Sequence, residues 1–479
     1  MKKKSNQTGG HLGKSFGLNM AIVLVVSNII GSGVFKKVAP MSELLLSPHW
    51  VVLAWVLAGV ITLFGVLSIA ELGTLFPESG GAYAWLERIY GRSISFFYGW
   101  SCFTVIQTAA IASIAYVFAG AAGSFISLPR LSPEWESMVV FGNIHPFENM
   151  GAKMVAGILI IILTLINIRG AEFGGAVSQI FTWIIVSCIV LIIVAGLSSA
   201  AGAWAHYDSP SQQYPPASFG TSLGLIGAFV IAMRHAFWGY EGWISLGYVG
   251  EEIRNPQKNI PRALVTGILI VIGSYVLLNF TYLFVMPIDE LLAEVQADEN
   301  TIAAVVVTNK IFGQSGALII SAMILVSTLG CTNTTILTAS RIYYAMGQHG
   351  LFFKKAGACH SRYNTPANSL IIQCIWACIL VFSGSFDMLT DLLIFAAFIF
   401  YGLVVGGVIW FRIRRKDLPR SYKTLGYPFL PIIFVLFCLL LVGISIYEMP
   451  EHSMIGLLLI ISGLPFYLYW TMRSGKSSS

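Results

Sequence analysis

Charged residues are scarce in this sequence of 479 residues. Aspartate, glutamate, lysine and arginine make up 10% of the chain, whereas hydrophobic residues make up 56% and the mean hydropathy is +0.77. A soluble domain usually carries about 25% charged residues. A soluble fold of this length could not bury so much apolar surface. The composition therefore predicts a membrane protein and excludes an ordinary soluble enzyme.

Patterns typical of disulfide-bonded domains, metal sites and enzymes are also missing. The seven cysteines include no CxxC pair, and Cys374 and Cys378, four residues apart, suit packing on one helix face. The sequence has no nucleotide-binding loop and no Ser/His/Asp set whose order suits catalysis. No cleavage-site pattern follows the first apolar run, so we expect no removable signal peptide. We therefore expect no enzymatic activity, no cofactor and no bound metal.

Long apolar runs dominate what the sequence does contain. A helix of about 20 apolar residues crosses the hydrocarbon core of a bilayer. Twelve such runs occur, and the longer ones must tilt, break or extend beyond the bilayer. They predict an all-α polytopic membrane protein with 12 transmembrane helices. The runs cover residues 16–39, 50–76, 95–125, 150–168, 174–197, 220–249, 262–286, 314–338, 367–385, 389–411, 426–447 and 453–472.

The basic residues are distributed unequally between the two sides of the predicted membrane. With a cytoplasmic N-terminus, 22 of the 28 lysines and arginines fall in inner segments, five fall in outer segments and Arg234 lies within a span. Cytoplasmic loops carry such an excess. The distribution predicts that both termini are cytoplasmic, in a plasma or bacterial inner membrane. It also accounts for the net charge of +6 without a nucleic-acid partner.

The first apolar run is interrupted by two glycines around a serine: Gly31, Ser32 and Gly33. Each glycine weakens a helix by about 1 kcal/mol relative to alanine. Unwound backbone at membrane depth must be buried or face a watery cavity. Freed amide groups beside the Ser32 hydroxyl would attract a carboxylate. The alternative is close packing of two helices through small residues.

The sixth run has a second interruption, at residues 237–243 (FWGYEGW). Glu241 costs about 2.5 kcal/mol or more in lipid, so it should face a polar interior. Freed carbonyl groups here could accept hydrogen bonds from an ammonium group. Glu241 could instead recognise a cationic side chain or carry a coupling proton. Because the breaks open two successive sets of five runs, they predict an inverted-repeat transporter with its site between them.

Five segments, in order along nearly the whole chain, resemble a known family. They are residues 29–35 (IIGSGVF), 70–83 (AELGTLFPESGGAY), 251–263 (EEIRNPQKNIPRA), 340–346 (SRIYYAM) and 417–428 (DLPRSYKTLGYP). Together they resemble the amino acid–polyamine–organocation (APC) transporters, particularly the L-type amino acid transporters and their bacterial relatives. The resemblance implies a LeuT-like fold, in which two inverted repeats of five helices, with helices 1 and 6 broken, precede two further helices.

The resemblance also implies a substrate site for L-amino acids. The break in helix 1 would bind the α-carboxylate and the break in helix 6 the amino group, mainly through backbone atoms. Trp238 matches the aromatic gate of the family. Selectivity would then come from the side chains that line the rest of the pocket. The implied substrate-binding residues are Ile29, Gly31, Ser32, Gly33, Trp238, Gly239, Glu241 and Ser245.

The coupling ion is left open by the sequence. Many relatives carry a lysine in helix 5 where this chain has Ile185. Sodium coupling, proton coupling and substrate exchange are therefore all compatible with the sequence. Ser327 and Thr328 in helix 8 are candidate sodium ligands, although such side chains in membrane helices more commonly bond to the backbone.

Two further gate or coupling candidates, Arg234 and His235, share a helix face with Trp238. We expect Arg234 to form a gate ion pair; recognition of an acidic substrate is the alternative. His235 is expected to be structural rather than a pH sensor. Glu71, near the inner end of the second run, is expected to be a solvated structural residue.

The sequence also bears on whether the protein needs a partner chain and on what it transports. Animal relatives that need a heavy chain use a cysteine between helices 3 and 4, and residues 126–149 contain none, so no disulfide-linked partner is expected. The predicted function is secondary active transport or exchange of amino acids. The alternatives are transport of a polyamine or another organic cation, and an amino acid sensor that does not transport.

The runs and loops divide the chain into successive segments. These are a cytoplasmic tail (1–15), a first five-helix repeat (16–197), an extracellular loop (198–219), a second five-helix repeat (220–411), a basic cytoplasmic loop (412–425), helices 11 and 12 (426–472) and a second cytoplasmic tail (473–479).

Overall fold

The structure is a computed structural model that describes residues 15–140, 145–212, 223–297, 302–383 and 386–475. Over these residues the regular structure is helical, and Phe16 pairs with Ile253 in an isolated bridge. Ten of the described helices are long and apolar enough to cross a membrane. The prediction of an all-helical polytopic membrane protein is thereby confirmed. Residues 1–14 and 476–479 of the predicted tails, and 213–219 of the predicted outer loop, lie outside the described residues.

The first half of the chain forms helices close to the predicted runs. The first run is divided among three of them, and the third run continues through a short π-helical turn, η1. Pro48 occupies the first turn of its helix, where its missing N–H is harmless. The elements are α1 (Leu18–Ile29), α2 (Gly33–Lys36), α3 (Val38–Leu45), α4 (Pro48–Leu75), α5 (Ala82–Tyr90), α6 (Arg92–Ser101), η1 (Cys102–Ile106), α7 (Gln107–Ala122), α8 (Pro133–Glu136), α9 (Met150–Ile168), α10 (Ala171–Leu197) and α11 (Trp204–Asp208).

The second half begins with the other broken run. Its elements are α12 (Gly224–Tyr240), η3 (Trp243–Glu252), α13 (Pro256–Val285), α14 (Ile288–Ala297), α15 (Ala303–Phe312), α16 (Gln314–Gln348), η4 (Lys354–Gly357), α17 (Ala367–Ser383), α18 (Phe386–Arg414), α19 (Phe429–Glu448), α20 (Pro450–Ile461) and α21 (Leu464–Gly475). The two predicted spans outside the ten long apolar helices correspond to α12 and α17, of 17 residues each. Helix α16 extends past the predicted end at 338 because the chain stays helical after its apolar stretch ends.

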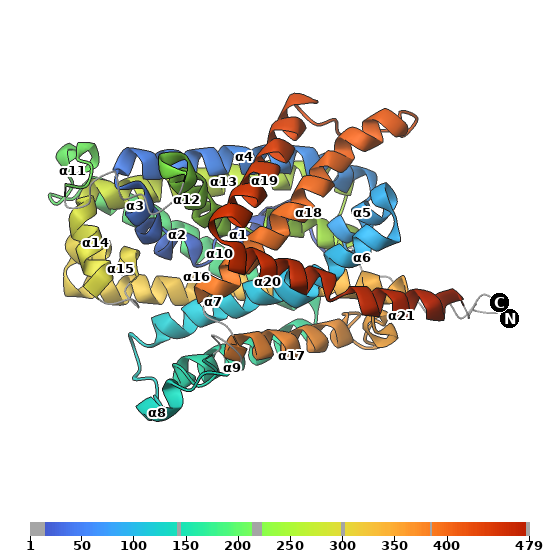
Figure 1. Cartoon of the computed structure of the whole chain (residues 1–479), viewed down its shortest axis with the longest axis horizontal. Coiled ribbons are helices and arrows are strands. Elements are labelled where there is room, and N and C mark those ends of the chain that lie inside the picture. The colour runs from blue at the N-terminus through green and yellow to red at the C-terminus, as the bar shows by residue number, and fades with distance from the viewer. Residues whose placement is uncertain (1–14, 141–144, 213–222, 298–301, 384–385, 476–479) are drawn as a thin grey trace.

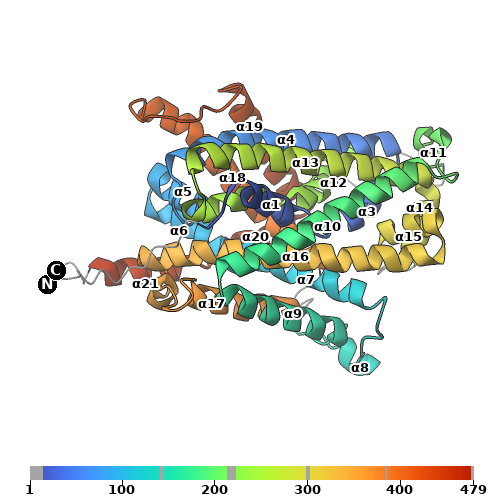
Figure 2. The same cartoon turned by 180° about the vertical axis from the view of Figure 1, so that it is seen from behind.

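The long helices lie side by side along the longest axis of the molecule. The short helices α8, α11 and α14 lie at one end and α5 lies at the other, so segments predicted as outer loops share one end (Figure 1). Seen from behind, α10 crosses α13 and α16 diagonally (Figure 2). Helix α4 packs along α13, α7 along α16 and α9 along α17. Each of these pairs joins one helix of the first predicted repeat to one of the second.

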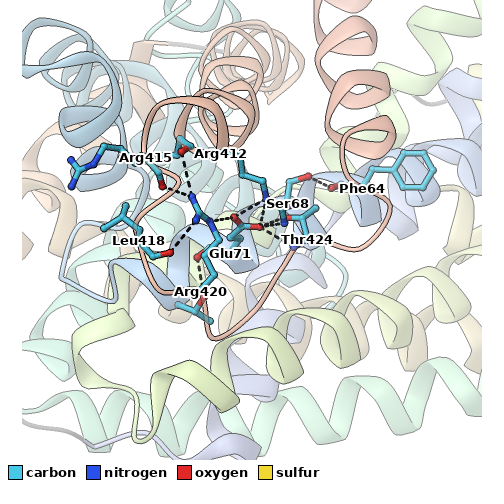
Figure 3. A network of polar contacts seen from close by, with 10 residues as sticks. Phe64, Ser68, Glu71, Arg412, Arg415, Leu418, Arg420 and Thr424 are labelled. Atoms are coloured by element: carbon cyan, nitrogen blue, oxygen red, sulfur yellow. Dashed lines mark hydrogen bonds and ion pairs between the residues drawn. The ribbon is translucent and has the colours of Figure 1, made fainter.

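Glu71 corrects one prediction, because this residue is buried rather than solvated. It lies near the end of α4 and is only 1% exposed. Its carboxylate accepts hydrogen bonds from Arg412 (2.5 Å), from Arg420 (3.0 Å) and from both the backbone N–H and the hydroxyl of Thr424 (2.8 Å each), as Figure 3 shows. The segment predicted as a basic cytoplasmic loop therefore folds back over the end of α4 and is held there by one carboxylate.

Candidate functional site

A cavity lies between the two broken helices. Its volume is about 20 Å³, which is close to the space of one water molecule. Seven of the eight residues predicted to bind substrate line it, and Gly239 is the exception. The lining residues are Asn28, Ile29, Gly31, Ser32, Gly33, Gln107, Ala110, Ile114, Trp238, Glu241, Gly242, Ser245, Cys331 and Thr335.

The two breaks touch each other through glycine backbone. A Cβ atom on Gly33 would lie 2.5 Å from the Cα of Gly239 and 3.4 Å from the Trp238 ring. Gly242 has a φ of +108°, and a Cβ there would lie 2.5 Å from the carbonyl oxygen of Asn28. Such distances leave no room for a side chain, and the positive φ favours glycine. The glycines that weaken the helices therefore also allow the two unwound segments to meet.

The break between α1 and α2 presents donor groups to the cavity. Helix α1 ends at Ile29 and α2 begins at Gly33. The backbone N–H groups of Ser32 and Gly33 have no backbone partner among the described residues. The Ser32 hydroxyl is buried, and it likewise has no hydrogen-bond partner within the described part of the chain. A buried hydroxyl without a partner costs about 1–3 kcal/mol, so a ligand acceptor at this point would be favourable.

The break after α12 places a carboxylate at the other side of the cavity. Glu241 lines the cavity, and its Oε1 accepts a hydrogen bond from the Tyr401 hydroxyl on α18 at 2.5 Å. The Ile29 carbonyl, which the sequence predicts as a ligand of an amino group, accepts a hydrogen bond from Tyr275 on α13 at 2.9 Å. A carbonyl oxygen has two lone pairs, so Ile29 keeps one acceptor position.

Four polar lining residues were not predicted from the sequence: Asn28, Gln107, Cys331 and Thr335. Asn28 and Thr335 also bond to their own helices, at the carbonyls of Leu24 and Cys331 respectively. A polar side chain in an apolar run is the only signal the sequence gives for such positions. That signal is weak, because Ser, Thr and Asn in membrane helices often bond to the preceding turn.

The coupling candidates in helices 5 and 8 lie outside the cavity lining. The Ser327 hydroxyl lies 3.2 Å from the carbonyl oxygens of both Ile30 and Gly31. It therefore donates to the acceptors that the break in helix 1 releases. Thr328 bonds to the carbonyl of Ile324 in its own helix, and Ile185 is a buried apolar residue on α10.

Arg234 points to α18 rather than into the cavity lining. Its Nη2 lies 3.0 Å from Oδ1 of Asp391, and the Nδ1 of His452 on α20 lies 3.3 Å from Oδ2 of the same carboxylate. The side chains of Arg234 and Asp391 are 5% and 11% exposed. The Arg234–Asp391 pair links α12, the part of the sixth run before its break, to α18, and His452 links the same carboxylate to α20. His235 is half-buried and is not a lining residue.

Further charged pairs lie toward the end of the molecule that carries α5. Arg341 on α16 pairs with Glu252 at 2.8 Å, and both side chains are almost fully buried. Nearer the surface, the Nδ1 of His349 lies 2.6 Å from the carboxylate of Glu87 on α5. The hydrogen bond from His349 lowers the pKa of Glu87 below its usual value of 4.5.

Comparison with known proteins decides the family. The family model described as amino acid permease matches residues 16–470. The chain belongs to the amino acid permease family. It is 30% identical to the serine/threonine exchanger SteT of Bacillus subtilis, over 98% of both chains. The match confirms the resemblance to APC transporters and shows that the protein is a transporter rather than an enzyme.

This amino acid permease also has animal relatives. It is 31% identical to the human b(0,+)-type amino acid transporter 1, over 95% of this chain and 88% of the relative. It is 30% identical to the human large neutral amino acids transporter small subunit 2, over 96% of this chain and 82% of the relative. The permease therefore carries amino acids across a membrane, and its bacterial relative is named as an exchanger.

Proposed function

We propose that the protein exchanges L-amino acids across a cell membrane by alternating access, with the substrate bound between the two breaks. The observation that carries this proposal is the central cavity, which brings the unwound backbone of both broken helices together with the Ser32 hydroxyl. Backbone groups recognise what all α-amino acids share. The narrow cavity volume means that the walls must separate to admit a substrate, as alternating access requires.

The substrate would lie with its charged groups at opposite breaks. The N–H groups of Ser32 and Gly33, with the Ser32 hydroxyl, would hold the carboxylate. The remaining lone pair of the Ile29 carbonyl and the freed backbone near Trp238 would hold the ammonium group. The Trp238 ring, next to Gly33, would cover the substrate on its outer side. Arg234 and Asp391 would form the outer gate pair that fixes this half of α12.

The proposed architecture is a LeuT-like arrangement of twelve helices with both termini in the cytoplasm. Two inverted repeats, 16–197 and 220–411, would be followed by helices 11 and 12 in 426–472. The packing of α4, α7 and α9 on α13, α16 and α17 supports this, because an inverted repeat places equivalent helices against one another.

We propose that transport is driven by the exchanged amino acid rather than by sodium. A relative named as a serine/threonine exchanger supports this proposal and makes L-serine and L-threonine the first substrates to test. We further propose function without a disulfide-linked heavy chain, because residues 126–149 contain no cysteine.

Reconstituted proteoliposomes test this function directly. Uptake of labelled L-amino acids is measured with and without internal unlabelled amino acids, a sodium gradient and a pH gradient. Exchange predicts uptake that requires internal amino acid and is indifferent to both gradients. Uptake of labelled polyamines alone would favour the organic cation alternative, for which Glu241 in the cavity would be the recognition group. Saturable binding of amino acids without flux would favour a sensor.

A further inference from the structure

Gln107 is a buried glutamine in the wall of the central cavity. The residue is 3% exposed and belongs to the cavity lining. The neighbouring Thr104 and Thr108 donate hydrogen bonds to carbonyl groups of the preceding helical turn, whereas the side-chain amide of Gln107 makes no hydrogen bond within the described part of the chain. A buried amide without a partner destabilises a protein, because it has given up its bonds to water. Since Gln107 lines the cavity, a ligand bound there is the partner that would satisfy it.

A π-helical turn directly precedes Gln107 and sets which helix face this residue occupies. The turn η1 ends at Ile106, and the backbone N–H of Gln107 donates to the carbonyl of Cys102, five residues earlier. Such turns insert one extra residue into a helix and are frequent at functional sites. After the turn, Gln107, Ala110 and Ile114 follow one another at separations of three and four residues, so they share one face of the helix. All three line the central cavity, and Gln107 is the polar group of that face.

Helix α16, which packs against α7, adds Cys331 and Thr335 to the same wall. Both residues already donate a hydrogen bond within the protein. The Cys331 thiol lies 3.4 Å from the carbonyl oxygen of Asn28, and the Thr335 hydroxyl lies 2.9 Å from the carbonyl oxygen of Cys331. In the binding mode proposed above, the charged groups of the amino acid lie at the two breaks, so its side chain would lie against this wall. There the amide of Gln107 offers that side chain both a donor and an acceptor.

We propose that Gln107 determines substrate specificity by selecting small, neutral side chains that carry a hydroxyl or carboxamide group. This inference rests on the proposed function and names the substrate class for the same site. A hydroxyl or carboxamide can donate to the side-chain oxygen of Gln107 and accept from its NH₂ group. An aliphatic side chain of the same shape would leave the amide unpaired, and a site built to hydrogen-bond its substrate rejects such analogues. The described lining residues of α7 and α16 are uncharged, so this wall offers no opposite charge to an acidic or basic side chain.

Exchange of L-threonine and L-valine in proteoliposomes tests the proposal, because these amino acids differ by a hydroxyl group in place of a methyl group. Liposomes are loaded with a mixture of unlabelled amino acids, and the maximal rate divided by the half-saturating concentration is measured for each labelled amino acid. Gln107→Met is compared with the parent protein and with Gln373→Met. Gln373 is a matched control, because it is also a buried glutamine in a helix, but its amide donates to the carbonyl of Ile336 at 3.2 Å and it does not line the cavity.

The parent protein should prefer L-threonine to L-valine about tenfold or more. Gln107→Met should lower this preference about fivefold or more by weakening the exchange of L-threonine, with the exchange of L-valine retained. Gln373→Met should keep the preference of the parent. A parent protein that carries L-valine as well as L-threonine would overturn the role of Gln107 without any variant, and so would an unchanged preference in Gln107→Met. No exchange of any labelled amino acid by the parent protein would instead overturn the proposed function.

Discussion

Gly33 and Gly239 bring the two broken helices into backbone contact, since a Cβ atom at Gly33 would lie 2.5 Å from the Cα of Gly239. One glycine belongs to the short helix that follows the first break, and the other lies just before the second break. If one unwound segment moves, the other must therefore move with it or the backbone contact between them must break. This contact also places the Ser32 hydroxyl and Glu241 on the same small cavity.

Ser32→Ala should weaken substrate binding without destabilising the protein. The hydroxyl is buried without a partner among the described residues, so its removal relieves an unpaired polar group. Losing a hydrogen bond to a charged carboxylate costs about 1.5–3 kcal/mol, so half-saturation should rise about tenfold or more. Exchange kinetics and thermal unfolding in detergent measure the two effects. Ser42→Ala is the matched control, because that hydroxyl is also buried and has no hydrogen-bond partner among the described residues, but it lies on α3, outside the cavity. Equal kinetics for the two variants would contradict the role of Ser32.

Arg234→Gln and Asp391→Asn should slow exchange without changing which amino acids compete. Removing one member of a buried ion pair costs about 3–5 kcal/mol, and this pair is nearly buried. Arg234 does not line the central cavity, so substrate preference should stay the same. Competition of labelled L-serine by a panel of amino acids measures preference. A selective gain or loss of inhibition by aspartate and glutamate in Arg234→Gln would show direct substrate recognition instead.

Glu71→Gln should destabilise the protein by about 3–5 kcal/mol, because it leaves two arginines beside a neutral group in a buried site. Half-saturation of exchange should remain that of the parent, because neither Glu71 nor any other residue of α4 lines the central cavity. Glu78→Gln is the matched control: its pair with Arg88 is exposed and should contribute less than about 1 kcal/mol. Thermal unfolding of the two variants should therefore differ clearly, and equal midpoints would refute the anchoring role.

The pair of Glu87 and His349 predicts an acid-dependent loss of stability. Because the pKa of Glu87 is lowered in the folded protein, its ionised form stabilises the fold above the ordinary pKa of 4.5. That contribution is lost as the pH falls through the lowered folded value. The unfolding midpoint of the parent protein should therefore decrease more steeply below about pH 4.5 than that of Glu87→Gln. The same dependence of the unfolding midpoint on pH in both proteins would show that the pair does not contribute to stability.

Sequence predicted the parts of this molecule that depend on local composition. Apolar runs predicted where the long helices lie, because lipid demands long apolar segments, although α16 continues to Gln348, past the predicted end at 338. Glycines on either side of a polar residue indicated both breaks, because glycine weakens a helix and a polar residue within a span needs a polar environment. The sequence alone therefore predicts that residues 29–33 and 238–245 lie near each other, on either side of one site.

Contacts between distant segments could not be predicted in this way. Glu71 was expected to be solvated, yet its partners lie more than 300 positions along the chain. Asn28 and Thr335 were missed because polar residues in membrane helices usually bond to their own backbone. Asp391 was missed because its pairing with Arg234 depends on how α12 packs on α18, which hydropathy does not encode.

If the substrate passes between the two touching breaks, Gly33→Val should block exchange. Amino acid exchange by Gly33→Val is compared with that of Gly443→Val, since a Cβ at Gly443 on α19 meets no atom within 4 Å. Both proteins are first shown to be folded by gel filtration and thermal unfolding in detergent. Gly33→Val is expected to retain less than about a tenth of the parent exchange rate because of overpacking at a close backbone contact, whereas Gly443→Val should keep nearly all of it. Near-normal exchange by folded Gly33→Val would contradict a substrate site between the breaks.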